Sequence, residues 1–443
     1  MTARPDPPGG VRSERFPLAA RALQAHTTHA VASPAGVQRR TAPAHNWALY
    51  LFLFLLPLQN LQTGHMPQFG GGLNFLNVMF AASLLGAWLT GGRVARNEPV
   101  NRWILAYAAY AVVSLLVGYG HVSGVNAHWN VLKDQLVAMF VCYLVQMSVR
   151  DWVAVRRVII ATLLPLPYIA KVTWIKHESV DRWHYAETMR VNGTFSLLGA
   201  NEFAAFCVTV AVVLFALLIA ARLSRSWRLA LMAGIACMAM GVLFAYSRTA
   251  YVSAILGLLT VALAWRGRWK LMLPLLLAAA LAPALLPTSV IERFASTTVE
   301  QDARDESTEN RFEFWQIAWD NFVRHPIVGS GYHSFHHHEI NPHDKDTHNL
   351  YMRALTEGGL LGATCLLGLL FAILRTARRE LARAPAGSLH YGLALGLLGA
   401  WVALACGNLF GDRFTYYPMI AYFWAYAALV VKAPHLAAER RPD

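Results

Sequence analysis

Residues 203–221 read FAAFCVTVAVVLFALLIAA, a run without a charged side chain between Glu202 and Arg222. An α-helix needs about 20 predominantly apolar residues to cross the roughly 30 Å hydrocarbon core of a bilayer. Similar apolar blocks recur along the chain after residue 45. Helices satisfy their own backbone hydrogen bonds in hydrocarbon, so the blocks predict an all-α fold. We expect a polytopic transmembrane helical bundle of about 12 spans.

The composition agrees with a membrane protein. Of 443 residues, 56% are hydrophobic and 14% charged, and the mean hydropathy is +0.38. Soluble domains carry about 25% charged residues. The net charge of +13 does not indicate nucleic acid as a partner, because the basic residues sit in short clusters between apolar blocks. Lys and Arg in such clusters set the topology of a membrane protein, whose surroundings are membrane lipids.

The cysteines and the N-terminal segment indicate no further chemistry. All five cysteines lie inside apolar blocks without a CxxC or metal-type spacing, so we interpret them as small hydrophobic residues. No cofactor is expected. Residues 1–45 are rich in Pro, Ala, Arg and Ser and lack a continuous apolar core. We therefore expect a disordered cytoplasmic tail and no cleaved signal peptide.

The apolar blocks divide the chain into membrane and loop regions. The expected spans are 46–61, 73–90, 102–119, 131–148, 153–172, 197–221, 228–246, 249–265, 270–287, 349–374, 389–410 and 415–432. Helices 1–9 thus occupy 46–287 and helices 10–12 occupy 349–432, with a large loop at 288–348 between them and a cytoplasmic tail at 433–443.

Alternate loops differ in positive charge. One set carries Arg93, Arg96 and Arg102; Arg150, Arg156 and Arg157; Arg222, Arg225 and Arg228; Arg266, Arg268 and Lys270; and Arg375, Arg378, Arg379 and Arg383. In the other set, loops 62–72 and 119–130 contain neither Lys nor Arg. The positive-inside rule places the first set and both termini in the cytoplasm.

Two expected outer segments are exceptional. The segment 171–201 carries basic residues although it faces outward, and the loop 288–348 is far longer than ordinary connections. Within this loop, aromatic residues at helical spacing predict an amphipathic helix that lies on the membrane or covers a cavity. These residues are Phe312, Trp315, Trp319 and Phe322.

Three arginines stand at outer membrane boundaries: Arg190, Arg248 and Arg311. Each alone is compatible with snorkelling to the interface or with pairing to a nearby carboxylate. Together they suggest an anion-binding site, because the planar guanidinium matches phosphate oxygens and stays charged when partly desolvated. A set that converges on one cavity would suit a lipid diphosphate headgroup without a metal.

The long loop ends in a histidine-rich run, comprising His333, His336, His337, His338, His343 and His348. His348 lies where the chain returns to the membrane, and a neutral imidazole there could accept a proton from a sugar hydroxyl. The alternatives are a surface histidine or a zinc site, although adjacent histidines are not a zinc spacing. We interpret Asp344-Lys345-Asp346 as solvated charge.

Four further polar residues lie in the first turns of spans on the outer side: Lys133, Asp134, Asn201 and Glu202. These residues either pair with one another or have a functional role, since ionisable groups within a membrane are often functional.

Several motifs occur in a fixed order along residues 190–362. They are Arg190-Val-Asn-Gly-Thr-Phe, Ser247-Arg248-Thr249, Arg311-(x3)-Trp315, His325-Pro-Ile-Val-Gly-Ser-Gly331, His348-Asn349-Leu-Tyr351 and Glu357-Gly-Gly-Leu-Leu-Gly362. In this order the chain resembles the O-antigen ligase and polymerase superfamily of bacterial envelope enzymes. Singly each motif is weak, and the ordered set is more specific.

The resemblance implies an inverting, metal-independent glycosyltransferase of the GT-C type in the bacterial inner membrane. Its donor would be a glycan on undecaprenyl diphosphate, and its acceptor in the ligase branch a sugar of the lipid A–core oligosaccharide. The active site would face the periplasm, on the large periplasmic loop. By motif, His348 would be the general base and Arg190, Arg248 and Arg311 would bind the diphosphate. Lys133, Asn201, Glu202, Asn349 and Tyr351 are supporting candidates.

Alternatives remain. An O-antigen polymerase or a protein O-oligosaccharyltransferase would use the same donor. The single large loop ending in His-Asn favours the ligase, and the short tail after residue 432 leaves little room for the outer domain expected of a protein-modifying enzyme. A transporter or flippase is the alternative from another class, but transporters place their substrate sites near the midplane, whereas these ionisable residues gather at one face.

The topology is testable by cysteine-accessibility labelling in cells. We expect single cysteines in the 288–348 loop to react with an impermeant reagent and cysteines in the Arg266–Lys270 loop to be protected. The reverse labelling pattern would overturn both the orientation and the site, because the expected chemistry requires all candidate residues on one side.

Overall fold

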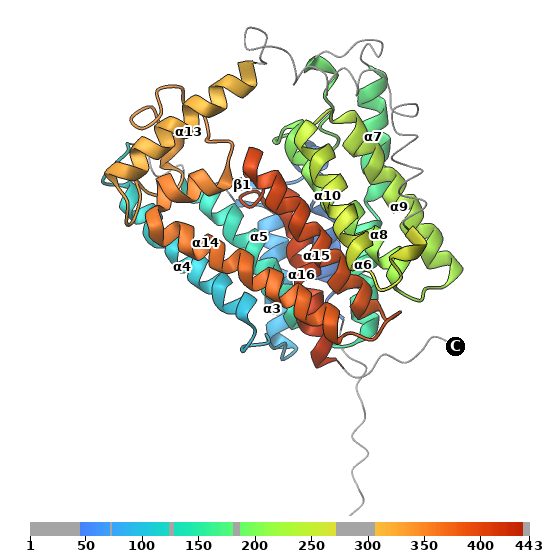
Figure 1. Ribbon diagram of the computed structural model, residues 1–443. Helices are drawn as coiled ribbons and strands as arrows, with labels where there is room; N and C mark the ends of the chain where they lie inside the picture. The colour runs from blue at the N-terminus through green and yellow to red at the C-terminus, as the bar shows by residue number, and fades with distance from the viewer. Residues whose placement is uncertain (1–44, 71–72, 124–127, 180–186, 272–305, 437–443) are drawn as a thin grey trace, which may run out of the picture. The chain divides into compact units, whose positions relative to one another are not determined.

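The computed structural model describes residues 45–70, 73–123, 128–179, 187–271 and 306–436 (Figure 1). These residues belong to the larger of two units, Ala44–Asp443. The expected cytoplasmic tail (apart from residue 45), nearly all of the expected span 270–287, the first part of the long loop and residues 437–443 lie outside the described ranges.

The described part is α-helical apart from one short hairpin, in which β1 (Gln68–Gly70) pairs antiparallel with β2 (Leu73–Asn74). The first group of helices is α1 (Trp47–Leu55), α2 (Gln59–His65), α3 (Phe75–Leu89), α4 (Pro99–Gly118), α5 (His128–Ser148), α6 (Trp152–Leu163) and α7 (Leu166–Glu178). The second group is α8 (Ala200–Ala220), α9 (Arg225–Phe244), α10 (Arg248–Ala264), α13 (Glu306–Arg324), α14 (Leu350–Arg383), α15 (Leu389–Gly407) and α16 (Tyr417–Lys432).

The all-α prediction is confirmed. Within the described ranges, 7 helices are long and apolar enough to cross a membrane, and α3 and α10 are shorter apolar helices. Every expected span inside these ranges coincides with a helix or a pair of helices. The total of about 12 spans stays a prediction. The first block, 46–61, forms two helices rather than one, because Pro57 lacks a backbone N–H and its ring hinders a continuous helix.

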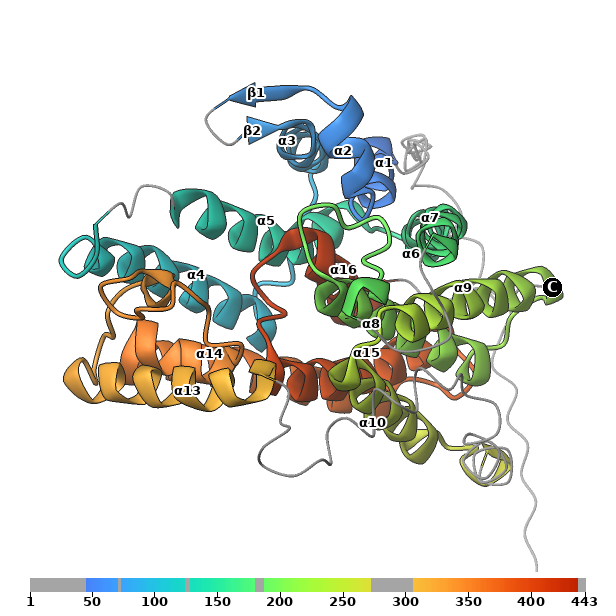
Figure 2. The ribbon, with the colours of Figure 1, turned by 90° about the horizontal axis from the view of Figure 1, so that it is seen from above.

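The core is formed where α8 packs against α9, α10 and α15, and where α16 packs against α5 (Figure 2). α16 is buried on all sides, and its Trp424, Tyr422 and Tyr426 have no exposed surface. The Tyr422 hydroxyl donates to the Leu53 carbonyl and that of Tyr426 to Thr162, whereas the Trp424 indole N–H has no hydrogen-bond partner among the described residues. A helix that is apolar all round is buried in this way.

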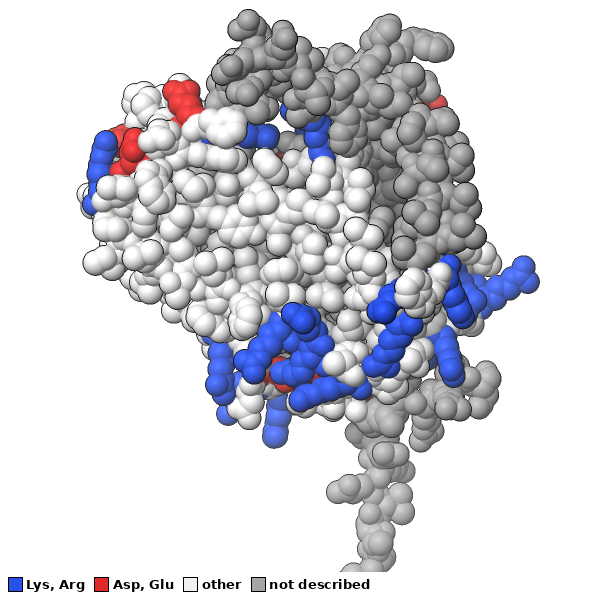
Figure 3. Space-filling view, viewed as in Figure 1, with Lys and Arg blue, Asp and Glu red and all other residues white. Residues whose placement is uncertain are grey.

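The surface carries its charge at one end. On the face shown in Figure 3, Lys and Arg side chains gather at one end, and a broad surface without charged side chains separates them from the few charges opposite. Large apolar side chains are exposed on the helices, among them Trp88, Leu229 and Ile255. This pattern suits helices that contact lipid.

Two of the sequence motifs pack directly on each other. Four backbone N–H groups join the segment after α13 to α14: Ser330 to the Thr356 carbonyl, Gly331 to that of Glu357, Leu360 to that of Pro326 and Leu361 to that of Ile327, at 2.8–3.1 Å. Gly359 leaves the helical conformation with φ of +59° and interrupts α14 at this contact. The motifs 325–331 and 357–362 are thus two halves of one backbone interface.

Gly329 tests this interface. Its φ is +70°, and a Cβ there would lie 2.3 Å from the Glu357 backbone. Gly329→Ala should therefore destabilise the protein by at least about 1–2 kcal/mol, read as a lower unfolding temperature of the purified protein in detergent. Gly64→Ala is the control, because a Cβ at Gly64 in α2 meets nothing within 4 Å. Equal stability of the two variants would contradict the role of this contact.

Candidate functional site

The start of α14 fixes the position of His348. The Asn349 side chain caps the helix by accepting from the backbone N–H groups of Tyr351 and Met352, at 2.9 and 3.2 Å. The Leu350 N–H donates to the Gly411 carbonyl at 3.2 Å. His348 precedes the cap with a φ of +49°, and its side chain is packed on one side and accessible on the other. Asn349 therefore has a structural role as a helix cap.

α13 brings Arg311 to the same place. Its buried face consists of Phe314, Ala318 and Asn321, and the Phe314 ring lies 6.4 Å from that of His348. The Trp315 indole donates to the Thr347 carbonyl at 2.9 Å. The expected amphipathic helix forms, but Phe312 and Trp319 of the predicted aromatic stripe are 59% and 48% exposed. These two residues face away from the protein.

The charges around His348 come from separate segments. Packing of protein atoms around the imidazole lowers the pKa of His348 below its usual 6.5; Asp346 opposes this shift, Arg311 reinforces it, and Glu202 and Arg413 act more weakly. His348 therefore lies within electrostatic reach of α8, α13 and the turn before α16. We call His348, Arg311, Glu202 and Arg413 the His348 cluster. A lowered pKa keeps the imidazole neutral near pH 7.

The first turn of α8 connects this cluster to Arg190. The Arg190 guanidinium donates to Asn201 Oδ1 at 2.6 Å, and Arg413 Nη1 donates to Glu202. Arg190 is held by its neighbours, since the Val191 N–H donates to the Phe244 carbonyl and the Thr194 hydroxyl to the Pro57 carbonyl. Asn201 and Glu202 thus pair with arginines rather than with each other.

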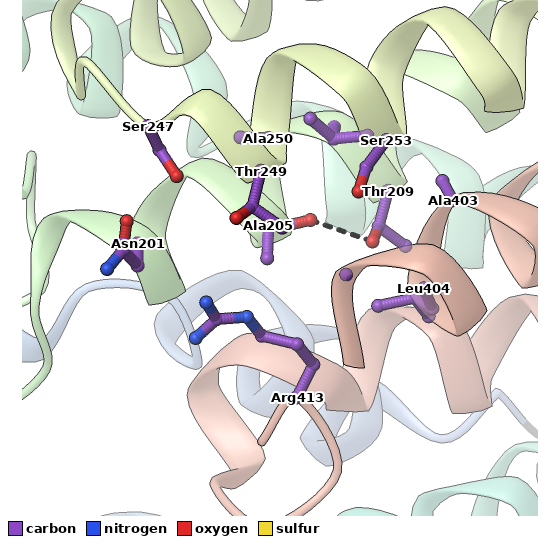
Figure 4. Close-up of a pocket in the computed structure, with 12 residues that line it drawn as sticks. Asn201, Ala205, Thr209, Ser247, Thr249, Ala250, Ser253, Ala403, Leu404 and Arg413 are labelled. Carbon is purple, nitrogen blue, oxygen red and sulfur yellow. Dashed lines mark hydrogen bonds between the residues drawn. The ribbon is translucent and has the colours of Figure 1, made fainter. Parts of the chain in front are cut away.

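A small polar pocket opens beside these residues. It lies between α8, α10 and α15, and Figure 4 shows Asn201, Ser247, Thr249 and Arg413 around it. Arg248 is the first residue of α10, between the lining residues Ser247 and Thr249. Arg190, through Asn201, and Arg248, through its two neighbours in the chain, thus lie beside this pocket, whereas Arg311 lies on α13, which packs beside His348.

Other candidates lie elsewhere or have structural contacts. Lys133 and Asp134 pair with each other, with Nζ and Oδ1 at 3.5 Å. The Tyr351 hydroxyl donates to the Ala405 carbonyl at 2.9 Å, which joins α14 to α15.

The remaining loop histidines fall into two groups. His333, His336 and His337 lie around His128 of α5, with the centres of neighbouring rings 4.7–5.6 Å apart, whereas His338 and His343 contact acidic residues. His343 contacts Glu313, His338 contacts Asp344, and His337 contacts His128 of α5 with the two Nε2 atoms at 2.7 Å. Burial lowers the pKa of His333 well below its ordinary range. In the ranges that the structure describes, no three or more His, Cys, Asp or Glu residues are grouped to hold a metal ion.

A buried ion network underlies the region. Arg353 of α14 is 5% exposed; its Nε donates to Glu357 at 2.9 Å, and its Nη1 donates to Asp412 and to Thr415, the latter at 2.8 Å. Its guanidinium also lies 5.3 Å from the Tyr332 ring centre. Glu357 in turn accepts from the His333 backbone N–H at 2.8 Å. α14, the loop after α13 and the 411–415 turn are thereby joined.

Sequence reasoning missed Arg353, Asp412 and Arg413. The signal was present in Gly411-Asp-Arg-Phe-Thr415, a short turn with both charges between two expected spans. Charged residues in a turn are usually solvated, and only the fold shows that Asp412 and Arg413 are 8% and 2% exposed.

Fold and site define a multi-pass membrane protein in which several arginines and His348 lie near the first turns of α8, α10 and α14. Residues 233–367 match the family model described as O-Antigen ligase, and the chain therefore carries a domain of the O-antigen ligase superfamily there. This confirms the resemblance. Arg248, Arg311 and His348 lie inside the matched segment, and Arg190, Asn201, Glu202 and Arg413 lie outside it. No curated protein matches the chain.

Asp412 provides a test of the ion network. Asp412→Asn leaves the buried Arg353 without one of its two carboxylates, and breaking a buried pair costs about 3–5 kcal/mol. We expect a clearly lower unfolding temperature in detergent. Asp134→Asn is the matched control, because its pair with Lys133 is more exposed and worth about 0–1 kcal/mol. A loss no greater than that of the control would show that the network does not stabilise the fold.

Proposed function

We propose that the protein is an O-antigen ligase. It transfers a glycan from undecaprenyl diphosphate to a hydroxyl of the lipid A–core oligosaccharide, at the periplasmic face of the inner membrane. The transfer inverts the anomeric centre and uses no metal. The observation that supports this function most is the packing around His348. Phe314 of α13, the helix of Arg311, lies 6.4 Å from the His348 ring, and the start of α14 bonds to the Gly411 carbonyl, in the turn whose Arg413 pairs with Glu202.

The reaction requires two kinds of group. The acceptor oxygen attacks the anomeric carbon, its proton passes to a base, and the bond from that carbon to the diphosphate breaks with its electron pair on the leaving oxygen. His348 is exposed and its pKa is lowered, so a neutral imidazole is available to take the proton. A general base contributes about 10²–10⁴-fold in rate.

The arginines stabilise the leaving group. Arg190, Arg248 and Arg311 supply positive charge near the position of the diphosphate, and preorganised donors of this kind are worth about 3 kcal/mol each in the transition state. Glu202 is the other possible base of the His348 cluster, but its carboxylate pairs with Arg413. This pairing favours His348 as the base.

The function is tested by the envelope profile of a deletion strain on a gel. Loss of the long-chain ladder, with intact core and accumulated lipid-linked polymer, is expected of a ligase. Core with a single repeat unit would indicate a polymerase instead, and an unchanged ladder would overturn the whole proposal.

Purified variants should distinguish the role of His348 in the transfer step from the role of the arginines in donor binding. His348→Ala should lower single-turnover transfer by about 10²–10⁴-fold and leave donor binding nearly unchanged. Arg190→Ala or Arg311→Ala should weaken donor binding by about 1.5–3 kcal/mol, and Lys at these positions should rescue poorly because it lacks the bidentate fork. His336→Ala and His338→Ala are controls in the same loop. Transfer at the wild-type rate by His348→Ala would exclude it as the base.

The pH profile gives a second measurement on the same residue. Only neutral His348 accepts a proton, so the rate should fall as the pH drops through a pKa that lies below 6.5. Arg311 lowers that pKa, so Arg311→Gln should move this acidic limb to higher pH. An acidic limb that stays in place, or moves down, would show that Arg311 does not act on the group that titrates.

A further inference from the structure

Two helices begin at the polar pocket without a side-chain cap. Gly199 precedes α8, and at the N-cap of α10 the Ser247 side chain makes no capping hydrogen bond. The first turns of both helices line the pocket through Asn201, Thr249 and Ala250. The first N–H groups of a helix have no partner within it and carry partial positive charge, so a helix start favours an anion. At α14, by contrast, Asn349 fills this role.

The pocket also holds buried polar atoms that lack acceptors or donors. Arg413 is 2% exposed, and its Nε has no hydrogen-bond partner in the part of the chain that the structure describes. The same holds there for Ser253 Oγ, on a residue that is 4% exposed. Both residues line the pocket, and their polar atoms are drawn in Figure 4. Buried polar groups are nearly always hydrogen-bonded, so these two atoms are available to a molecule that enters the pocket.

The size of the pocket limits what enters it. It has room for about one water-sized group. A single phosphate oxygen fits this space, whereas a whole sugar or a complete phosphate does not. Glu202 opposes anion binding and takes up Nη1 of Arg413. The Nε–H of the same guanidinium stays available as a donor, and Arg190, on the neighbouring Asn201, adds positive charge.

We propose that this pocket is a phosphate-oxygen subsite in which Arg413, Ser253 and the starts of α8 and α10 hold an oxygen of the donor's diphosphate. The inference rests on the proposed function. It makes Arg413 a fourth arginine of the donor site, supplied by the turn between α15 and α16. Arg413 then contacts the leaving group directly, and Glu202 orients its guanidinium.

The test is binding of defined lipids to the purified full-length protein in detergent. The probes are undecaprenyl diphosphate and undecaprenyl monophosphate, with inorganic pyrophosphate to detect sites that need no lipid. Arg413→Gln should weaken undecaprenyl diphosphate binding by about ten- to a hundredfold, as expected for a charge-assisted contact. It should weaken monophosphate binding less, so the preference for diphosphate shrinks. Arg324→Gln, an exposed arginine at the end of α13, should change neither.

Two more conservative substitutions keep the test valid if Arg413→Gln does not fold. Arg413→Lys keeps the charge but loses Nε, and Ser253→Ala removes only the hydroxyl. Both should reduce the diphosphate preference, by about threefold or more for a lost neutral hydrogen bond. If pyrophosphate alone binds and the Arg413 variants weaken its binding, the subsite is supported. The result would also show that the subsite recognises the phosphate and not the prenyl chain.

Other outcomes overturn the inference. Wild-type diphosphate preference in the folded Arg413 and Ser253 variants would show that the pocket holds water only. Equal weakening of both lipids by Arg413→Gln would make Arg413 a residue that merely shapes the fold. If the wild-type protein itself shows no preference for the diphosphate lipid, the proposed function fails and the subsite fails with it.

Discussion

The buried guanidinium of Arg353 is the constraint on which the site depends. A charge that is 5% exposed is tolerated only when its hydrogen bonds and its charge are satisfied together. Glu357 lies on the same helix, whereas Asp412 and Thr415 come from the turn before α16. α14 and this turn cannot separate without exposing an unpaired charge to a low-dielectric interior.

This constraint fixes the candidate site residues through two segments, the start of α14 and the 411–415 turn. On α14, the helix begins just after His348, and its first N–H group bonds to the Gly411 carbonyl. In the turn, Arg413 directly follows Asp412 and reaches across to Glu202 of α8. Glu357 extends the network to the backbone of the loop after α13, and Arg311 lies in the N-terminal half of that helix. One buried network thus fixes three segments far apart in the chain.

The starts of helices recur in the site for a physical reason. Helices α8, α10 and α14 all begin there. The starts of α8 and α10 lack a side-chain cap and provide N–H groups without partners in their own helices, whereas Asn349 caps α14. A diphosphate carries the charge that such a region favours. The long apolar helices thus hold the candidate residues in the turns at one of their ends. The matched family segment, 233–367, contains only part of this region, because α8 and the 411–415 turn lie outside it.

The sequence by itself determined the helices and singled out several candidate residues for the site. Apolar blocks near the bilayer thickness define spans wherever they stand, and Arg190, Arg248, Arg311 and His348 are recognisable because a charge at a membrane boundary is conspicuous. The tertiary structure decided the pairings. Nothing local predicts that Arg413 joins Glu202, 211 residues away, or that Arg353 finds Asp412. Nor does helical spacing predict that Phe314 faces inward and Trp319 outward, since both faces of α13 carry aromatic residues. Spacing along a chain encodes one helix at a time, whereas burial and charge pairing depend on which helices become neighbours.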